Sequence, residues 1–77
     1  MAIRRWYRTA RWAALRARVL LEEPWCPDCQ AESGIVVQAR DVHHVRKHQG
    51  DSALFWSRAN LQALCHAHHA VRTGRGE

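Results

Sequence analysis

Apolar residues near the start of the chain recur with helical spacing. They fall at i, i+3 and i+7 and close with two leucines: Trp12, Leu15, Val19, Leu20 and Leu21. An apolar stripe with this period is typical of an amphipathic helix. Because Pro24 cannot continue a helix, the pattern predicts a helix from about Thr9 to Glu22 that packs through this stripe.

The middle of the chain lacks this period and predicts short extended segments. Residues 25–29 carry Pro and Asp between two cysteines and predict a tight turn, and Gly34 is expected to end the loop that follows. A β-branched run at 35–37 and the residues 38–45 predict two short strands or one bent hairpin. We expect a polar loop over 46–53.

The last third of the chain returns to an apolar pattern. Residues 54–56 (Leu-Phe-Trp) form an apolar run that we expect to enter the core. Residues from about 61 to 72 predict a second helix. One face of it would carry Leu61, Leu64, Cys65 and His68. Strands and helices in this arrangement predict a small α+β fold.

The length of the chain bears on how such a fold is stabilised. With 77 residues there is room for one domain, residues 1–77, with a helical arm at about 4–22 and a core at about 25–73. A domain of this size commonly needs disulfides or a metal ion. Three cysteines cannot all pair within one chain, whereas six histidines favour a metal. No apolar run approaches the ~18 residues of a membrane span, so we expect no membrane association.

Positive charge is concentrated near the N-terminus. Twelve Arg and Lys against seven Asp and Glu give a net charge of +5. The first 21 positions hold no acidic residue and six arginines: Arg4, Arg5, Arg8, Arg11, Arg16 and Arg18. Such a segment suits a polyanion such as nucleic acid, because the guanidinium group matches phosphate geometry. A transit peptide and a helix lying on a membrane surface are the alternatives for the same residues.

Two pairs of metal-binding side chains lie at the ends of the core. Cys26-x-x-Cys29 and Cys65-x-x-His68 each place two ligands at a spacing from which both reach one ion. Four such ligands complete a tetrahedral Zn²⁺ site and leave no position for a substrate, so we expect a structural zinc. It would tie the N-terminal half to the last helix. The alternative is a set of inert buried cysteines with a surface histidine.

A second group of residues is suited to catalysis. On a strand, Asp41 and His43 point to one face and His44 to the other, so His43 can bind a metal while His44 accepts a proton. His69 follows His68 and projects about 100° further around the helix, toward a different site. His43 and His69 therefore predict a divalent ion with open positions for phosphate and water, and Asp41 is a further candidate. Two unrelated histidines are the alternative.

These motifs resemble those of the small HNH endonucleases, most closely the phage-type branch with a CxxC zinc site. The resemblance extends over about residues 12–73 and rests on three motifs. They are Val42-His43-His44-Val45, Gly50-Asp51 followed by Leu54-Phe55-Trp56, and the run from Asn60 through Cys65, His68 and His69 to Arg72-Thr73. The fold that it implies is a ββα-metal module, in which a hairpin and a helix hold one divalent ion beside a structural zinc.

The resemblance implies a role for each matching residue. It makes His44 the general base, His43 and His69 the ligands of the catalytic ion, and Asn60 the residue that braces the loop and helps to orient the base. The zinc ligands would be Cys26, Cys29, Cys65 and His68.

Two positions depart from the pattern of most relatives. His68 stands where a fourth Cys is usual, and Arg72 stands where Lys is common. Imidazole is a competent zinc ligand, so we expect the site to persist. The neighbouring His66 leaves the identity of the liganding imidazole open, although the spacing favours His68.

The implied activity is hydrolysis of DNA phosphodiester bonds, with one strand nicked per module. A neutral His44 is required, so activity should fall below about pH 6.5. Imidazole, oxygen and water ligands suit Mn²⁺, Mg²⁺, Co²⁺ or Ni²⁺. The expected contacts to DNA phosphates are Arg4, Arg5, Arg8, Arg11, Arg18 and Arg72.

Two other classes of protein fit part of the sequence. A zinc-stabilised DNA-binding module would need the cysteines and the arginines but not the three histidines together. A redox or zinc-storage protein would need an exposed dithiol. We expect a monomer or weak homodimer in the reducing cytoplasm, where thiolates stay on zinc. A phage packaging partner or a role in host defence is implied by analogy alone.

Overall fold

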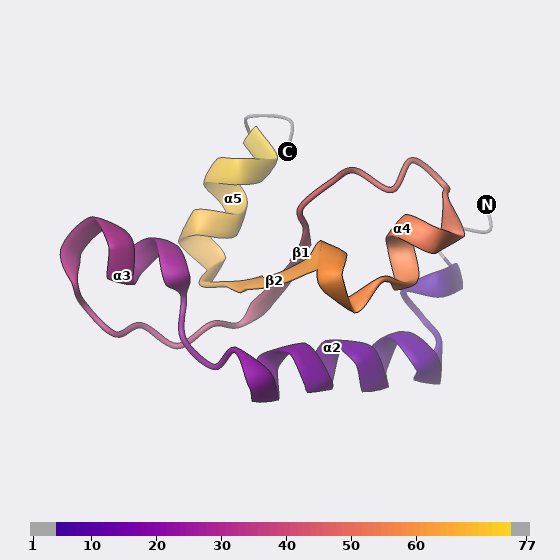
Figure 1. Cartoon of the computed structure of the whole chain (residues 1–77), viewed down its shortest axis with the longest axis horizontal. Coiled ribbons are helices and arrows are strands. Elements are labelled where there is room, and N and C mark those ends of the chain that lie inside the picture. The colour runs from indigo at the N-terminus through magenta and orange to yellow at the C-terminus, as the bar shows by residue number, and fades with distance from the viewer. Residues whose placement is uncertain (1–4, 75–77) are drawn as a thin grey trace.

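Two short strands and the helices around them make up residues 5–74, the part of the chain that the computed structural model describes (Figure 1). The elements are α2 (Ala10–Glu22), α3 (Pro27–Ser33), β1 (Asp41–His44), α4 (Ser52–Trp56), the 3-10 turn η1 (Arg58–Asn60), β2 (Leu61–Leu64) and α5 (His66–Gly74). Among the helices of residues 5–74, none is long and apolar enough to cross a membrane.

The two strands form an antiparallel sheet whose second strand was not predicted. β1 pairs with β2, with Val42 opposite Ala63 and His44 opposite Leu61. The predicted helix over 61–72 is therefore wrong in its first turn, and α5 begins only at His66. Leu61 and Leu64 are spaced as on a helix, but they enter two different apolar clusters. A spacing of three residues alone cannot tell whether two leucines share one face of a helix or enter different clusters from a strand.

The predicted hairpin within residues 35–45 is also wrong. Residues 35–37 form no strand, and nearby Gln38 makes only an isolated bridge to Trp25. Ile35 and Val36 are exposed, so their β-branched side chains find no core to cover. The hairpin partner of β1 comes instead from β2, beyond the loop that contains α4.

Helix α2 matches its prediction closely and lies along one face of the sheet. The Thr9 hydroxyl caps it by accepting a hydrogen bond from the Trp12 amide at 3.1 Å. Trp12 and Val19 are buried, whereas Leu21 is 83% exposed and does not belong to the predicted stripe. Two residues beyond Val19, Leu21 points about 200° away from it and so toward solvent.

The segment after Pro24 is helical rather than a simple turn. Cys26 is the N-cap of α3, and Pro27 begins the helix, where its missing N–H has no partner to lose. Gly34 ends α3 with φ of 70°, a left-handed conformation that favours glycine. The prediction that Gly34 ends a loop is thus corrected, since it ends this helix. The short helix leaves Cys26 and Cys29 on one side.

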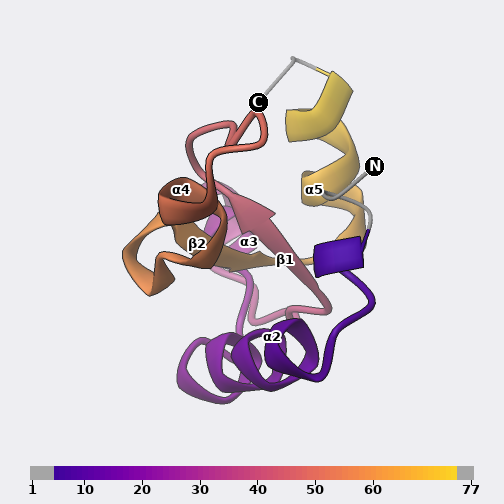
Figure 2. The same ribbon diagram turned by 90° about the vertical axis from the view of Figure 1, so that its right-hand side faces the viewer.

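The core lies between α2 and the sheet, and the opposite face of β1 carries α5 (Figure 1, Figure 2). Phe55, from the predicted apolar run, is fully buried there, and Asp51 caps its helix α4. The main cluster consists of Trp12, Val19, Ala39, Phe55, Leu61 and Ala63. A second cluster contains Leu64 with the cysteines and joins α3 to the start of α5.

Candidate metal and catalytic site

Four side chains from α3 and the start of α5 converge as predicted from their spacing. Ligand atoms of Cys26, Cys29, Cys65 and His68 all lie within 4.8 Å of one another. The Sγ atoms of Cys29 and Cys65 are 3.6 Å apart, and His68 Nδ1 lies 3.7, 3.3 and 3.2 Å from the sulfurs of Cys26, Cys29 and Cys65. Zinc–sulfur bonds near 2.3 Å place tetrahedral ligands about 3.5–3.8 Å apart. The four atoms therefore fit a zinc ion.

The orientation of the His68 ring is set from outside the cluster. Its Nε2 donates a hydrogen bond to the Glu32 carboxylate at 2.7 Å. Because a carboxylate accepts only, Nε2 carries a proton, which leaves Nδ1, the ring atom that faces the sulfurs, as the one able to bind a metal. His66 instead donates from Nδ1 to Asp41, which resolves the imidazole of the cluster in favour of His68.

On their own, the four side chains compete for protons. Burial opposes ionisation of Cys65, yet hydrogen bonds from His68 lower its pKa to about 7. Burial and the neighbouring thiols raise the pKa of Cys29 to about 12. All three cysteines are free of disulfides. A divalent cation would favour all of the thiolates at once, so binding it releases protons.

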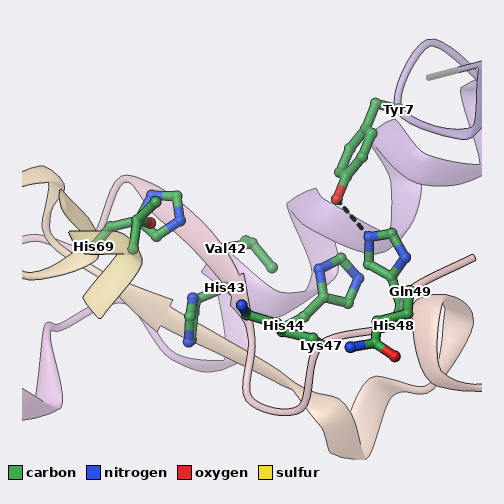
Figure 3. A pocket seen from close by; sticks show the side chains of 9 residues that line it. Tyr7, Val42, His43, His44, Lys47, His48, Gln49 and His69 are labelled. Carbon is green, nitrogen blue, oxygen red and sulfur yellow. Dashed lines mark hydrogen bonds between the residues drawn. The ribbon is translucent and has the colours of Figure 1, made fainter. Parts of the chain in front are cut away.

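A pocket of about 540 Å³ lies beside β1, separate from the cysteine cluster (Figure 3). It brings together His43 and His44 from β1 and His69 from α5, as the sequence predicts. The remaining lining residues are Tyr7, Val42, Lys47, His48, Gln49 and Thr73. In Figure 3, His69 lies at one end of the pocket and the Tyr7–His48 pair at the other, with His43 and His44 between them.

His44 is held in one tautomer by the backbone. Its Nε2 lies 3.1 Å from the Phe55 carbonyl oxygen, which can only accept, so Nε2 carries the proton and Nδ1 keeps its lone pair. The ring stacks on Trp12 at 5.6 Å between centroids and 14° between planes. Burial lowers the pKa of His44 below its ordinary value of 6.5, and the nearby His48 and His43 add to this effect. The ring is therefore neutral at neutral pH.

His69 and His43 face each other on the α5 side of the sheet. Their ring centroids are 5.6 Å apart, and His43 is buried. His69 donates from Nδ1 to Asp41 at 2.9 Å, so its Nε2 keeps a lone pair. Burial opposes ionisation of Asp41, but hydrogen bonds from His69 and His66 hold its pKa below the ordinary value. Asp41 thus lies where it orients His69.

Asn60 lies outside the pocket and braces its loop. Its Oδ1 accepts from the Arg46 amide at 2.8 Å, and its Nδ2 donates to the carbonyls of Arg46 and Leu54 at 3.0 Å each. These bonds join the chain after His44 to the helix that contains Phe55, the partner of His44. The Asn60 side chain therefore links these two segments of the chain.

Asn60→Asp should lower the stability of the fold, because it breaks the bracing hydrogen bonds. The carboxylate can accept from Arg46 but cannot donate to two carbonyls, so we expect a loss of at least about 2 kcal/mol in the free energy of unfolding. Urea denaturation measures this loss, with Gln62→Glu on the neighbouring strand as the control. Unchanged stability in Asn60→Asp would contradict the bracing role.

The arginines predicted to contact DNA have different surroundings. Arg5, Arg8, Arg11 and Arg18 are exposed, and Arg11 lies 4.0 Å above the Trp56 ring. Arg4 lies outside the described residues. Arg72 instead pairs with Asp28 through two hydrogen bonds of 2.9 and 2.7 Å, which join α5 to α3. Its side chain therefore takes part in the fold.

Sequence reasoning did not single out Tyr7, Lys47 or His48 as pocket residues. They flank the predicted strand and helix without a motif, and only tertiary contacts bring them to His44. Trp12 was expected in the core, and the structure adds its stacking on His44. The high number of histidines was the one signal in the sequence that pointed toward His48.

Comparison with known proteins adds the family. No family model and no curated protein matches the chain. Among solved structures, the crystal structure of the HNH endonuclease of the deep-sea thermophilic bacteriophage GVE2 with a manganese ion is similar to it. The two are 28% identical with a TM-score of 0.86, over 97% of this chain and 82% of that one. This likeness confirms the predicted α+β fold and, together with the Cys₃His cluster, supports the resemblance of the chain to the phage-type HNH endonucleases.

Proposed function

We propose that this protein is a metal-dependent endonuclease that hydrolyses phosphodiester bonds of DNA and nicks one strand per active site. The observation that carries the proposal is one pocket in which His44 offers an unprotonated Nδ1 beside the facing rings of His43 and His69. The manganese ion in the similar phage endonuclease supports a divalent ion, such as Mn²⁺, Mg²⁺, Co²⁺ or Ni²⁺, at this pocket.

The residues of the chain divide the reaction between them. His44 Nδ1 takes the proton of the water that attacks phosphorus in line with the leaving oxygen. His43 and His69 would hold a divalent ion, which would stabilise the negative charge that develops on the phosphate. Asp41 orients the ring of His69, and Asn60 holds the loop that keeps His44 against Phe55.

The Cys₃His cluster has a separate task in this proposal. With all four positions taken by protein ligands, a zinc ion there has no place for substrate and acts on the fold alone. His68 and His69 are neighbours on α5, so the same helical turn that completes the zinc site also presents His69 to the pocket. We expect the three thiols to stay reduced in the cytoplasm.

Arginines at the N-terminal end of the chain are proposed to bind DNA phosphates. Replacing Arg8 and Arg11 by Gln should weaken binding to every DNA sequence and reduce the slope of log K against log salt by about 0.9 for each phosphate that is no longer neutralised. Fluorescence anisotropy at several salt concentrations measures both effects. Arg72→Gln is the matched control, because its partner is Asp28 and its loss should lower stability rather than the salt slope. An unchanged slope in the double variant would place the DNA elsewhere.

Incubation of supercoiled plasmid with the zinc-loaded protein and each divalent metal tests the proposal. Conversion to open circles that requires added metal supports a nickase, and linear product at early times points to a homodimer. Tight DNA binding without cleavage under every condition would contradict the proposal and favour a zinc-stabilised DNA-binding module.

A further inference from the structure

The end of the pocket farthest from His69 carries a second set of groups suited to phosphate (Figure 3). We propose that Tyr7 and Lys47, with His48 as a positioning residue, form a second phosphate subsite. It would bind the phosphate next to the scissile phosphate on the same DNA strand. This inference rests on the proposed function. It adds a binding site that is separate from the proposed general base, His44, and from the proposed metal ligands, His43 and His69.

The direction of the hydrogen bonds around His48 supports this assignment. The Gly50 amide donates to His48 Nδ1 at 3.2 Å, so Nδ1 carries no proton. The neutral ring therefore has its proton on Nε2, which donates to the Tyr7 hydroxyl oxygen at 3.1 Å. The Tyr7 O–H is then left to donate to another acceptor. Phosphate oxygens are the acceptors that DNA would bring to this pocket.

The Tyr7 ring is fixed by its neighbours. Its centroid lies 5.3 Å from that of Trp12 and 4.9 Å from that of Phe55, and both contacts are edge-to-face. Burial raises the pKa of Tyr7 above its ordinary value of 10.0, so the hydroxyl keeps its proton at any working pH. A rigid, protonated donor loses little entropy when a phosphate binds.

Lys47 adds charge to the pocket that Tyr7 lines. It is the one lysine of the chain, is exposed, and lines the pocket beside His48. An ammonium group is a point charge that attracts phosphate without a fixed geometry, and the Tyr7 hydroxyl supplies the direction.

The size of the pocket leaves room for more than one phosphate. A volume of about 540 Å³ is in the range of pockets that enclose a drug-sized ligand. The Tyr7 and His44 ring centroids are 6.3 Å apart, and His69 lies beyond His44 (Figure 3). The two ends therefore serve different groups of one bound strand.

Binding of a fluorescent single-stranded oligonucleotide without added divalent metal tests the subsite directly. We expect Tyr7→Phe to weaken binding about tenfold, the loss of one hydrogen bond to a charged group, with the salt slope unchanged. Lys47→Gln should reduce the salt slope by about 0.7, and Lys47→Arg should restore it. If either residue had only a structural role, Tyr7→Phe would not change the affinity alone and Lys47→Gln would not change the salt slope. Equal affinity and slope in all three variants would overturn the proposal.

His48 is tested as a positioning residue by a double-mutant comparison. His48→Leu removes the donor to Tyr7 and should weaken binding, whereas His48→Gln keeps a donor and should recover part of it. Neither change should weaken Tyr7→Phe further, since the hydroxyl that they orient is absent. Additive losses would mean that His48 acts independently of Tyr7 and would overturn its positioning role.

Hydrolysis separates this inference from the proposed function. Bis(p-nitrophenyl) phosphate contains one phosphate, so Tyr7→Phe should lose less activity on it than on DNA. His44→Ala should lose both activities. Equal losses on both substrates in Tyr7→Phe would place Tyr7 at the reacting phosphate and overturn the second subsite. A wild type that cuts neither substrate would defeat the proposed function, and the binding comparison would still decide the subsite.

Discussion

Replacing His44 with alanine will lower the rate of DNA nicking by about 10²- to 10⁴-fold, the usual contribution of a general base. The Nδ1 lone pair that faces the pocket disappears, while the Cys₃His cluster is untouched. Plasmid nicking measures the rate, and zinc content with far-UV circular dichroism confirms the fold. His44→Gln is the matched variant, because its amide can still donate to the Phe55 carbonyl.

The glutamine variant separates the two tasks of His44. If the ring acts as a base, both variants lose activity to a similar extent, and activity in His44→Gln near the wild-type level would show a structural role instead. The wild-type rate should fall as acid protonates Nδ1. Because burial lowers the pKa of His44, the midpoint of this fall should lie below pH 6.5. A midpoint above 6.5 would exclude His44 as the titrating base.

Cys29→Ser will leave the protein largely unfolded at 25 °C. Structural zinc contributes about 10–16 kcal/mol in small zinc domains, as much as or more than the total stability of about 5–15 kcal/mol of a typical domain. The Cys29 sulfur lies 3.6 Å from Cys65 and 3.3 Å from His68, so its loss opens the junction between α3 and α5. Far-UV circular dichroism and thermal melting measure the loss of helix.

Glu32→Gln provides the graded counterpart. It should weaken zinc binding about 10- to 100-fold, because the amide no longer fixes the His68 ring as strongly, and excess zinc should restore the fold. Excess zinc should not rescue Cys29→Ser. A Cys29→Ser protein that stays helical without zinc would contradict the stabilising role of the cluster.

Residues close in sequence were the most predictable part of the two sites. The CxxC and CxxH spacings correctly predicted the cluster, because ligands three residues apart reach one ion on a turn or a helix. The alternation along β1 also placed His43 and His44 on opposite faces, and Asp41 with His43. In each case the local backbone geometry alone decides the outcome.

Long-range contacts account for most of what the sequence did not reveal. β2 was assigned to a helix, because its apolar residues satisfy three-residue spacing and its partner strand is remote. Asp41 was a candidate metal ligand, and only its contacts with His66 and His69 indicate an orienting role. Arg72 has the right charge for DNA, but its bond to Asp28 depends on how α3 and α5 meet.

The turn at the start of α5 should tolerate few amino-acid substitutions. From Cys65 to His69, two side chains face the cysteine cluster and two contact Asp41. Only Ala67 has no such contact there, and Ala70 follows it on the exposed surface. A library of random substitutions selected for cleavage should therefore recover varied residues at these two alanines and nearly invariant ones between them.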